Sequence, residues 1–285
     1  MATLFVNNLT VLDFSLLDAE RGMLGESWIV DVELSGELDD AGMVFDFGVV
    51  RKHVKDILDD CLDHKLAVPT LNDALQELKT SPEVALTWRY NKGLIAMQAP
   101  ACSTAAIPVA EINIDAVTPW LEEQVLPHMP SNVTGVKLHL RLEEMGSTPF
   151  YHYSHGLKKH DGNCQRIAHG HRSRIEIFTG NERATQWEKE WARRWHDIYI
   201  GSKEDLKEII HIEGAGYYVF EYTANQGYFS LTLPIAHCYL IDTDSTVEFL
   251  AEHIAQQLAQ EAPEQAFYVR AYEGVGKGAI ARSNG

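Results

Sequence analysis

The feature that most constrains the fold is a weak internal repeat, because each copy of a repeat must form a similar structural unit. Residues 24–36 and 169–180 both place a small turn before an alternating strand that ends in glycine. Further segments of the same kind then follow in the same order in each half. Since 285 residues suffice for two such units, the sequence predicts one domain over 1–145 and a second over 146–285.

The segments that follow the first strand predict an α+β fold, with antiparallel sheets that carry helices on one face and with an inserted hairpin in each unit. The apolar residues of the helices recur at helical spacing, and those of the final strands alternate. The paired segments are a helix ending at Leu62 and a helix-like stretch from Glu182 to about Trp195, hairpin turns at 91–93 and 225–227, helices at about 115–128 and about 246–260, and strand ends at Glu144 and Glu273.

Composition and charge exclude several classes of protein. Hydrophobic residues make up 45% of the chain and charged residues 23%, as in ordinary folded proteins. The net charge of −17 disfavours a general nucleic-acid surface. No apolar run approaches the roughly 20 residues that cross a bilayer, and the N-terminal residues do not resemble a secretion signal. The four cysteines form no C-x-x-C pair, so we expect neither disulfides nor a zinc ribbon, and a reducing cytoplasm is the expected location.

The strongest chemical signal is a cluster of histidines between residues 151 and 178. His169 and His171 are two residues apart on a predicted strand, so both side chains face the same side of the sheet. His155, from the preceding strand, can supply a third ligand. Three imidazoles around Zn²⁺ leave the fourth position open, which is the catalytic arrangement. The alternative is a set of solvated surface histidines.

Cys164 precedes His169 by five residues and can lie beside the metal without completing its shell. A thiol near a cation is available as a base or a nucleophile. Metal ligation by Cys164 and a buried, inert cysteine are the alternatives.

A local excess of cations in the same region could bind a phosphate-bearing substrate, although a cationic strand edge is an equal alternative. Asp161 is the only acid between residues 152 and 174. The cations are Lys158, Lys159, Arg166, Arg172 and Arg174.

Acidic residues near predicted helix and strand ends give further candidates. Asp63 and His64 could form a carboxylate–imidazole pair in which His64 acts as a proton donor, although taken alone the two residues are better explained as a surface helix end. Glu144 and Glu273 could each accept two N–H donors from a guanidine-like heterocycle, or be exposed strand ends. Ser245-x-x-Glu248 is explained as a capping box that opens the last helix, with a substrate role for Glu248 as the alternative.

Taken together, these residues resemble the 6-pyruvoyltetrahydropterin synthase / 6-carboxytetrahydropterin synthase family, whose members share the tunnelling fold (T-fold). The resemblance covers nearly the whole chain as two tandem units, each incomplete. It implies barrels that close on oligomerisation. The matching segments are His155, Cys164 with His169-Gly-His171, Asp46-Phe47, Leu62-Asp63-His64, Ser245-Thr246-Val247-Glu248, and Glu273.

The resemblance implies that the two units contribute different residues to the site. Leu24 and Glu26 stand where the second unit has His169 and His171, so only the C-terminal unit is expected to bind Zn²⁺. The family relationship implies one composite site, in which Asp63-His64 of an N-terminal unit meets the zinc and Cys164. Whether both parts come from one chain is left open.

The activity implied by the resemblance is zinc-dependent elimination of triphosphate from 7,8-dihydroneopterin triphosphate, giving a 6-pyruvoyl or a 6-carboxy tetrahydropterin product; the queuosine branch is preferred by family frequency. Cys164, Asp63 and His64 would be catalytic, and His155, His169 and His171 would bind Zn²⁺. A homo-oligomer is expected. The alternatives are a non-catalytic zinc- and pterin-binding T-fold protein and, less favoured, a nitrile reductase or uricase of the same architecture. The substrate-binding residues would be Glu273, Glu144, Glu248 and Thr246.

Overall fold

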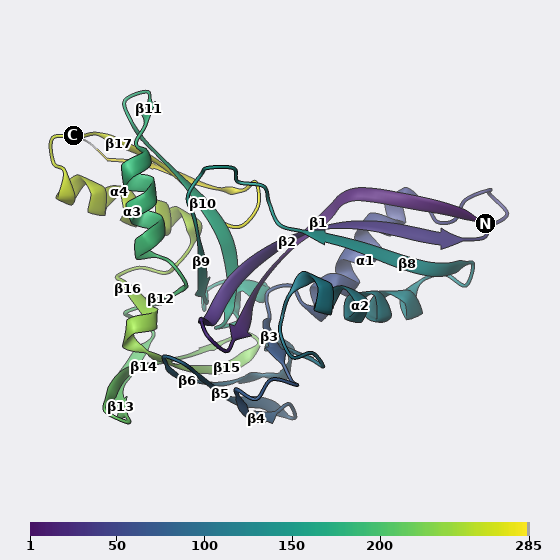
Figure 1. Ribbon diagram of the computed structural model, residues 1–285, viewed down its shortest axis with the longest axis horizontal. Coiled ribbons are helices and arrows are strands. Elements are labelled where there is room, and N and C mark those ends of the chain that lie inside the picture. The colour runs from purple at the N-terminus through teal and green to yellow at the C-terminus, as the bar shows by residue number, and fades with distance from the viewer. Residues whose placement is uncertain (284–285) are drawn as a thin grey trace.

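The computed structural model describes residues 1–283, which form three β-sheets and four α-helices. Figure 1 shows the N-terminal unit on the right, the C-terminal unit on the left, and the third sheet below them. Its architecture is the predicted α+β arrangement of two tandem units. No helix in residues 1–283 is long and apolar enough to span a bilayer.

The N-terminal unit is a five-stranded sheet with the order β7-β3-β1-β2-β8. Its centre is antiparallel, whereas the β1–β3 and β3–β7 pairs are parallel and were not predicted. Helix α1 begins because Asp46 accepts N–H groups of Gly48 and Val49, and it buries Val50, Val54 and Leu58 at helical spacing. The elements are β1 (Ala2–Asp18), β2 (Gly22–Gly36), α1 (Phe47–Cys61), β3 (Leu66–Pro69), β7 (Thr104–Ile107), α2 (Ile114–Val125) and β8 (Val133–Arg141).

The C-terminal unit repeats this plan, with the strand order β16-β12-β9-β10-β17-β18 and the short β11 paired with β10. The predicted helix over 182–195 is shorter, because Glu182 and Arg183 form β11. Strand β18 was not predicted. The elements are β9 (Phe150–His155), β10 (His169–Thr179), β11 (Glu182–Arg183), α3 (Thr185–Arg194), β12 (Ile198–Ser202), β16 (Cys238–Ile241), α4 (Val247–Glu261), β17 (Phe267–Tyr272) and β18 (Gly278–Arg282).

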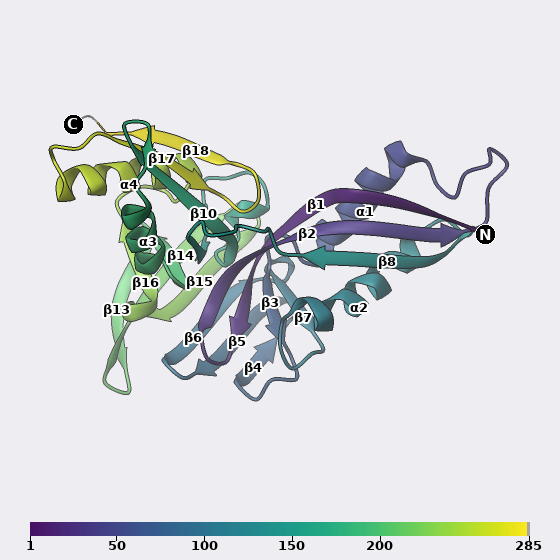
Figure 2. The ribbon, with the colours of Figure 1, turned by 45° about the horizontal axis from the view of Figure 1, so that its top comes forward.

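The inserted hairpins of both units join into one six-stranded sheet, β13-β14-β15-β6-β5-β4 (Figure 2). The joint is the antiparallel pair β6–β15, which centres on Met97 opposite Leu231. This shared sheet buries a core of its own, including Trp88 and Phe229. The strands are β4 (Leu75–Lys79), β5 (Glu83–Tyr90), β6 (Gly93–Pro100), β13 (Leu206–Ile212), β14 (Ala215–Ala224) and β15 (Gly227–Pro234).

Strand registers define equivalent positions in the two units. Leu16 pairs with Leu24 as His155 pairs with His169. The two sheets meet at equivalent residues: the Oγ atoms of Ser15 and Ser154 are 2.7 Å apart. A Cβ added to Gly170 would lie 2.6 Å from the Cα of Gly25, so glycine permits this close contact. The units are therefore related by an approximate two-fold symmetry that places β1 and β2 against β9 and β10.

Candidate functional site

Three histidines of the C-terminal unit converge at the contact between the units. His155 ends β9, and β10 begins with His169 and carries His171. One ring nitrogen of each lies within 4.8 Å of the other two. All three side chains are buried. The sequence-based prediction of strand alternation is confirmed here, since His169 and His171 face the same side.

The outward-facing nitrogens of these rings are held by neighbouring groups. Nδ1 of His155 is 3.0 Å from both the carbonyl oxygen and Oγ of Ser245. Nδ1 of His169 donates to the carbonyl oxygen of Arg166 at 2.9 Å. Nδ1 of His171 lies 3.2 Å from Oδ1 of Asp13, within ion-pair distance but without a hydrogen bond. Such contacts orient imidazoles and leave Nε2 free for a metal ion.

The donor set fits a divalent metal ion. Nε2 of His155 and Nε2 of His171 are buried and have no hydrogen-bond partner within the described chain, which would be costly unless a ligand completed them. Burial lowers the pKa values of His155 and His169 well below the usual range. Both rings are therefore neutral near pH 7, the form that binds a metal.

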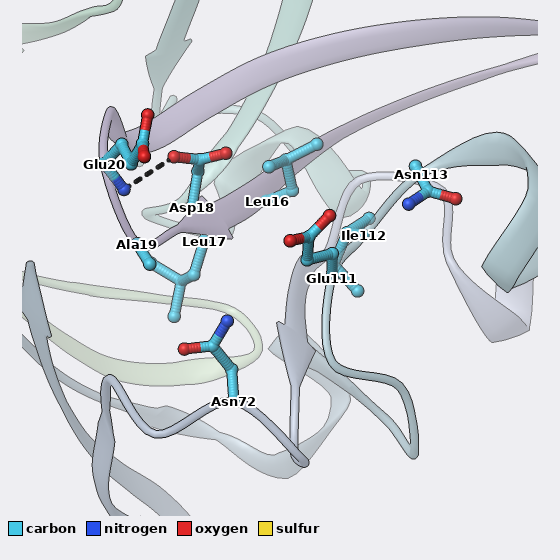
Figure 3. A pocket seen from close by; sticks show the side chains of 9 residues that line it. All are labelled: Leu16, Leu17, Asp18, Ala19, Glu20, Asn72, Glu111, Ile112 and Asn113. Atoms are coloured by element: carbon cyan, nitrogen blue, oxygen red, sulfur yellow. Dashed lines mark hydrogen bonds between the residues drawn. The ribbon is translucent and has the colours of Figure 1, made fainter.

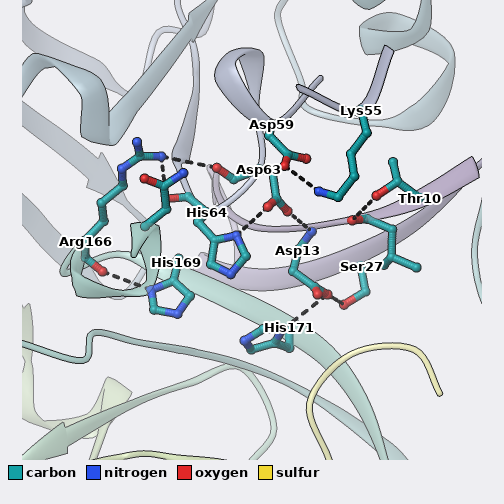
Figure 4. Close-up of polar contacts among 12 residues, drawn as sticks. Thr10, Asp13, Ser27, Lys55, Asp59, Asp63, His64, Arg166, His169 and His171 are labelled. Carbon is teal, nitrogen blue, oxygen red and sulfur yellow. Dashed lines mark hydrogen bonds and ion pairs between the residues drawn. The ribbon is translucent and has the colours of Figure 1, made fainter. Parts of the chain in front are cut away.

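Asp63 and His64 of the N-terminal unit reach this cluster within the same chain (Figure 4). His64 follows α1 in a left-handed conformation, with φ of 54°. Its Nδ1 lies 2.5 Å from Oδ2 of Asp63, and its ring centroid is 5.2 Å from that of His169. A nitrogen of His64, the sulfur of Cys164 and a nitrogen of His169 lie within 4.8 Å of one another. The composite arrangement therefore needs no second chain.

Charge partners keep His64 protonated. Burial acts to lower the pKa of His64, but contacts with Asp63 and Cys164 outweigh it and raise this pKa to about 10. Asp63 is itself fixed, because its Oδ1 accepts the backbone N–H of Asp13 at 2.8 Å. At neutral pH the ring of His64 is therefore an imidazolium, which can donate a proton.

Asp13 connects the two halves of the cluster, and the sequence reasoning missed it. Its Oδ1 accepts the hydroxyl of Ser27 at 2.5 Å, and its Oδ2 lies 3.2 Å from Nζ of Lys277. Burial alone would raise the pKa of Asp13, but His171, Lys277 and Ser27 hold it below its usual range. The one available signal was an acid within the apolar run Val11–Leu17, which a soluble protein buries only with partners.

Replacing Asp13 by asparagine should weaken metal binding about 10–100-fold, because a carboxylate beside a ligand histidine orients the ring and raises its basicity. Asparagine retains the shape but not the charge. Competition with a chromophoric chelator measures the affinity. Asp31→Asn is the control, since Asp31 pairs with Arg141 away from the site; equal affinities in wild type and Asp13→Asn would refute the role of Asp13.

The four predicted substrate residues fall in different places. Oε1 of Glu273 is 4.0 Å from Nε2 of His171, at the cluster. Thr246, and not Ser245, is the N-cap of α4, because Thr246 accepts the N–H of Phe249; Ser245 instead contacts His155. The capping box was therefore assigned one residue too early. Glu248 is exposed in the first turn of α4.

Glu144 does not occupy the position equivalent to Glu273. Val30 pairs with Leu140 as Ile175 pairs with Ala271, so continuing both chains by two residues makes Leu142 the equivalent of Glu273. Glu144 is exposed and makes no hydrogen bond or ion pair to the described residues. The sequence-based prediction that matched Glu144 with Glu273 was wrong, because β8 already ends at Arg141.

The five cations of the predicted basic patch do not form one surface of unpaired positive charge. Lys158 pairs with Glu204 and Asp205, and Lys159 with Glu204 and Asp244. Both Arg172 and Arg174 contact Glu143. Only Arg166 reaches the site, where it donates to the carbonyl oxygens of Asp63 and His64 at 3.3 Å. Acids distant in sequence neutralise Lys158, Lys159 and Arg174, whereas Arg172 donates to the backbone carbonyl oxygen of Glu143.

Part of the chain is similar to known tetrahydropterin synthases. A family model described as 6-pyruvoyl tetrahydropterin synthase matches residues 18–125. A putative 6-carboxy-5,6,7,8-tetrahydropterin synthase of Pyrococcus horikoshii is 25% identical over 116 residues, 41% of this chain and 66% of that protein. The match therefore spans just under two thirds of that relative.

Solved structures of 6-pyruvoyltetrahydropterin synthases also align with the chain. That of a catalytic-residue mutant from Plasmodium vivax covers 49% of this chain and 90% of its own, with 18% identity and a TM-score of 0.40. That from Plasmodium falciparum covers the same shares, with 16% identity and a TM-score of 0.39.

Proposed function

We propose that the chain is a zinc-dependent pterin synthase acting on 7,8-dihydroneopterin triphosphate, a proposal supported by the match of residues 18–125 to the 6-pyruvoyl tetrahydropterin synthase family model and by the similarity to a putative 6-carboxy-5,6,7,8-tetrahydropterin synthase. The observation that carries the proposal is the meeting of Asp63 and His64 with Cys164 and three buried histidines. Neither unit alone holds this set of residues. The reaction proposed is triphosphate elimination, with a 6-pyruvoyl or a 6-carboxy tetrahydropterin as product.

In this proposal His155, His169 and His171 hold the metal. Zn²⁺, when bound, supplies Lewis-acid chemistry that acidifies the hydroxyl groups of the substrate. Ser245, Arg166 and Asp13 keep the three rings in position through their Nδ1 atoms.

Proton transfer falls to the residues on either side of the metal ligands. Cys164 accepts a proton from the side chain of the substrate, and the protonated His64 donates or shuttles one, held by Asp63. The C–O bond to the triphosphate breaks, and its electron pair leaves with the triphosphate. Of the five cations considered from the sequence, Arg166 is the one placed to contact an anionic group here.

Glu273 is proposed to anchor the pterin ring. Its carboxylate lies at the cluster and can accept two N–H groups of a guanidine-like heterocycle. Nζ of Lys277 lies 3.9 Å from Oε2 of Glu273. Thr246 and Glu248, at the start of α4, remain proposed substrate contacts because Ser245 places that helix end beside His155.

The direct test is to incubate the zinc-loaded protein with 7,8-dihydroneopterin triphosphate and measure released triphosphate. We expect turnover in the wild type and suppression in Cys164→Ala. Mass spectrometry of the pterin, with an assay for acetaldehyde, distinguishes the pyruvoyl from the carboxy product. Absence of turnover with several dihydropterins would refute the enzymatic proposal.

A non-catalytic zinc- and pterin-binding protein is the second candidate. It is favoured by the loss of the metal-binding residues from the N-terminal unit, where Leu24 and Glu26 replace histidines. Tight pterin binding without product, unchanged in Cys164→Ala, would select this alternative over the synthase.

We also propose that the chain forms a homo-oligomer in the cytoplasm. The strand orders leave β7, β8, β16 and β18 at sheet edges, and pairing of such edges between chains would close the sheets into barrels in a homo-oligomer. The cysteines of the chain are all free, which suits a reducing cytoplasm.

A further inference from the structure

The N-terminal unit contains an open pocket of about 370 Å³ that the proposed reaction does not use. Its apolar wall consists of Leu16, Trp28, Ile112, Ile114 and Leu142. Glu26, Asn113 and Asp115 supply the polar groups. We call it the Glu26 pocket. It adjoins the hollow in Figure 3, because Leu16, Ile112 and Asn113 line both.

Strand register shows that the Glu26 pocket is the counterpart of the metal cluster. Leu16 and Leu24 are equivalent to His155 and His169, so Glu26 is equivalent to His171. In the same way, Leu142 is equivalent to Glu273.

The start of the neighbouring helix extends this correspondence. Asn113 caps α2 as Thr246 caps α4, so Ile112 is equivalent to Ser245. Ile112 and Leu16 line the pocket together, as Ser245 contacts His155 in the other unit. Apolar side chains therefore stand where the metal cluster has its polar groups, and a cavity is retained.

Glu26 is the one ionisable group at the equivalent of a metal ligand. Oε1 accepts the backbone N–H of Ser27 at 2.9 Å, and no cation pairs with the carboxyl within residues 1–283. Burial raises the pKa of Glu26 to about 7, although the nearby charges of Arg172 and Arg21 act to lower it. Asp115 adds a second acid, and none of the lining residues is basic.

We propose that the Glu26 pocket binds a small organic cation, an amine or amidine on an aromatic or aliphatic body. The apolar wall, which includes the indole of Trp28, would bury the body of the ligand. The carboxylate of Glu26 would accept the N–H groups of its cationic end. A metal ion is a poor fit, because Leu16 and Leu24 stand where the metal cluster has His155 and His169. An anion is also a poor fit, because Glu26 and Asp115 would repel it.

Benzamidine is the probe, because it joins an aromatic ring to an amidinium group. By isothermal titration calorimetry on the full chain, we expect one saturable site with a dissociation constant of about 1 mM or tighter. Neutral benzamide should bind at least about tenfold more weakly, and benzoate should not bind. Equal binding of benzamide and benzamidine would overturn the proposed recognition of charge.

Matched variants locate the site. Glu26→Gln should weaken benzamidine binding at least about tenfold, whereas Glu273→Gln, which removes a carboxylate beside the metal cluster and outside this pocket, should have no effect. Leu142→Trp should block the pocket; because Leu142 is 40% exposed, the larger side chain can be accommodated without disturbing the core. Unchanged binding in both Glu26→Gln and Leu142→Trp, or loss only in Glu273→Gln, would overturn the proposal. None of these measurements depends on pterin turnover.

Discussion

Replacing His64 by asparagine should lower the rate of triphosphate release by about 10²–10⁴-fold, the usual contribution of a positioned proton donor. Asparagine tolerates the left-handed conformation of residue 64, so the backbone after α1 should be kept. The ligand histidines are unchanged, and zinc content should therefore stay near that of the wild type. Triphosphate release, measured with zinc content on the same sample, gives the result.

The C-terminal unit offers a matched control for His64. Ser15 pairs with Leu66 as Ser154 pairs with Tyr199, which makes Asp197 the equivalent of His64, and both have φ near 55°. His196 also contacts Asp197, but its side chain is 62% exposed. His196→Asn should therefore keep the wild-type rate. Loss of less than about tenfold in His64→Asn would exclude His64 as the proton donor.

Replacing His169 by alanine should reduce bound zinc from about one ion per chain to a small fraction of that, and triphosphate release should be lost with it. His169 lies between the other metal ligands and the proposed proton donor. Its ring centroid is 4.4 Å from that of His155 and 5.2 Å from that of His64. Two remaining imidazoles cannot complete a three-nitrogen site. Elemental analysis after dialysis gives the zinc content.

His160→Ala is the control for this second prediction, because His160 belongs to the same histidine cluster in the sequence but is exposed outside the metal group. It should retain zinc and activity. A wild-type zinc content in His169→Ala would contradict the assignment of the metal ligands.

The sequence was most informative where a local pattern determines geometry. Strand alternation places His169 and His171 on one face, and the hairpin turns at 91–93 and 225–227 connect β5 to β6 and β14 to β15. Asp13, Ser245 and Lys277 were missed because their contacts to the site cross between strands or units. Such contacts follow from tertiary packing and leave no periodic signal.

Register explains the predictions that failed. Glu144 and Glu273 look alike as glutamates after an alternating strand, but pairing with the neighbouring strands puts Leu142 at the position of Glu273. The basic patch failed for a related reason. Lys158 and Lys159 are close in sequence to the histidines, yet their acidic partners, including Glu204, come from about 45 residues away.

The joined hairpins, with Met97 opposite Leu231, have a consequence for how such a molecule can change over evolution. In a complex of identical subunits, one codon determines the same residue in every subunit, so a substitution that inactivates one site inactivates every copy of that site. Here each half has its own codons while remaining paired to the other. One half can lose its ligands and be selected for a different task without harm to its partner.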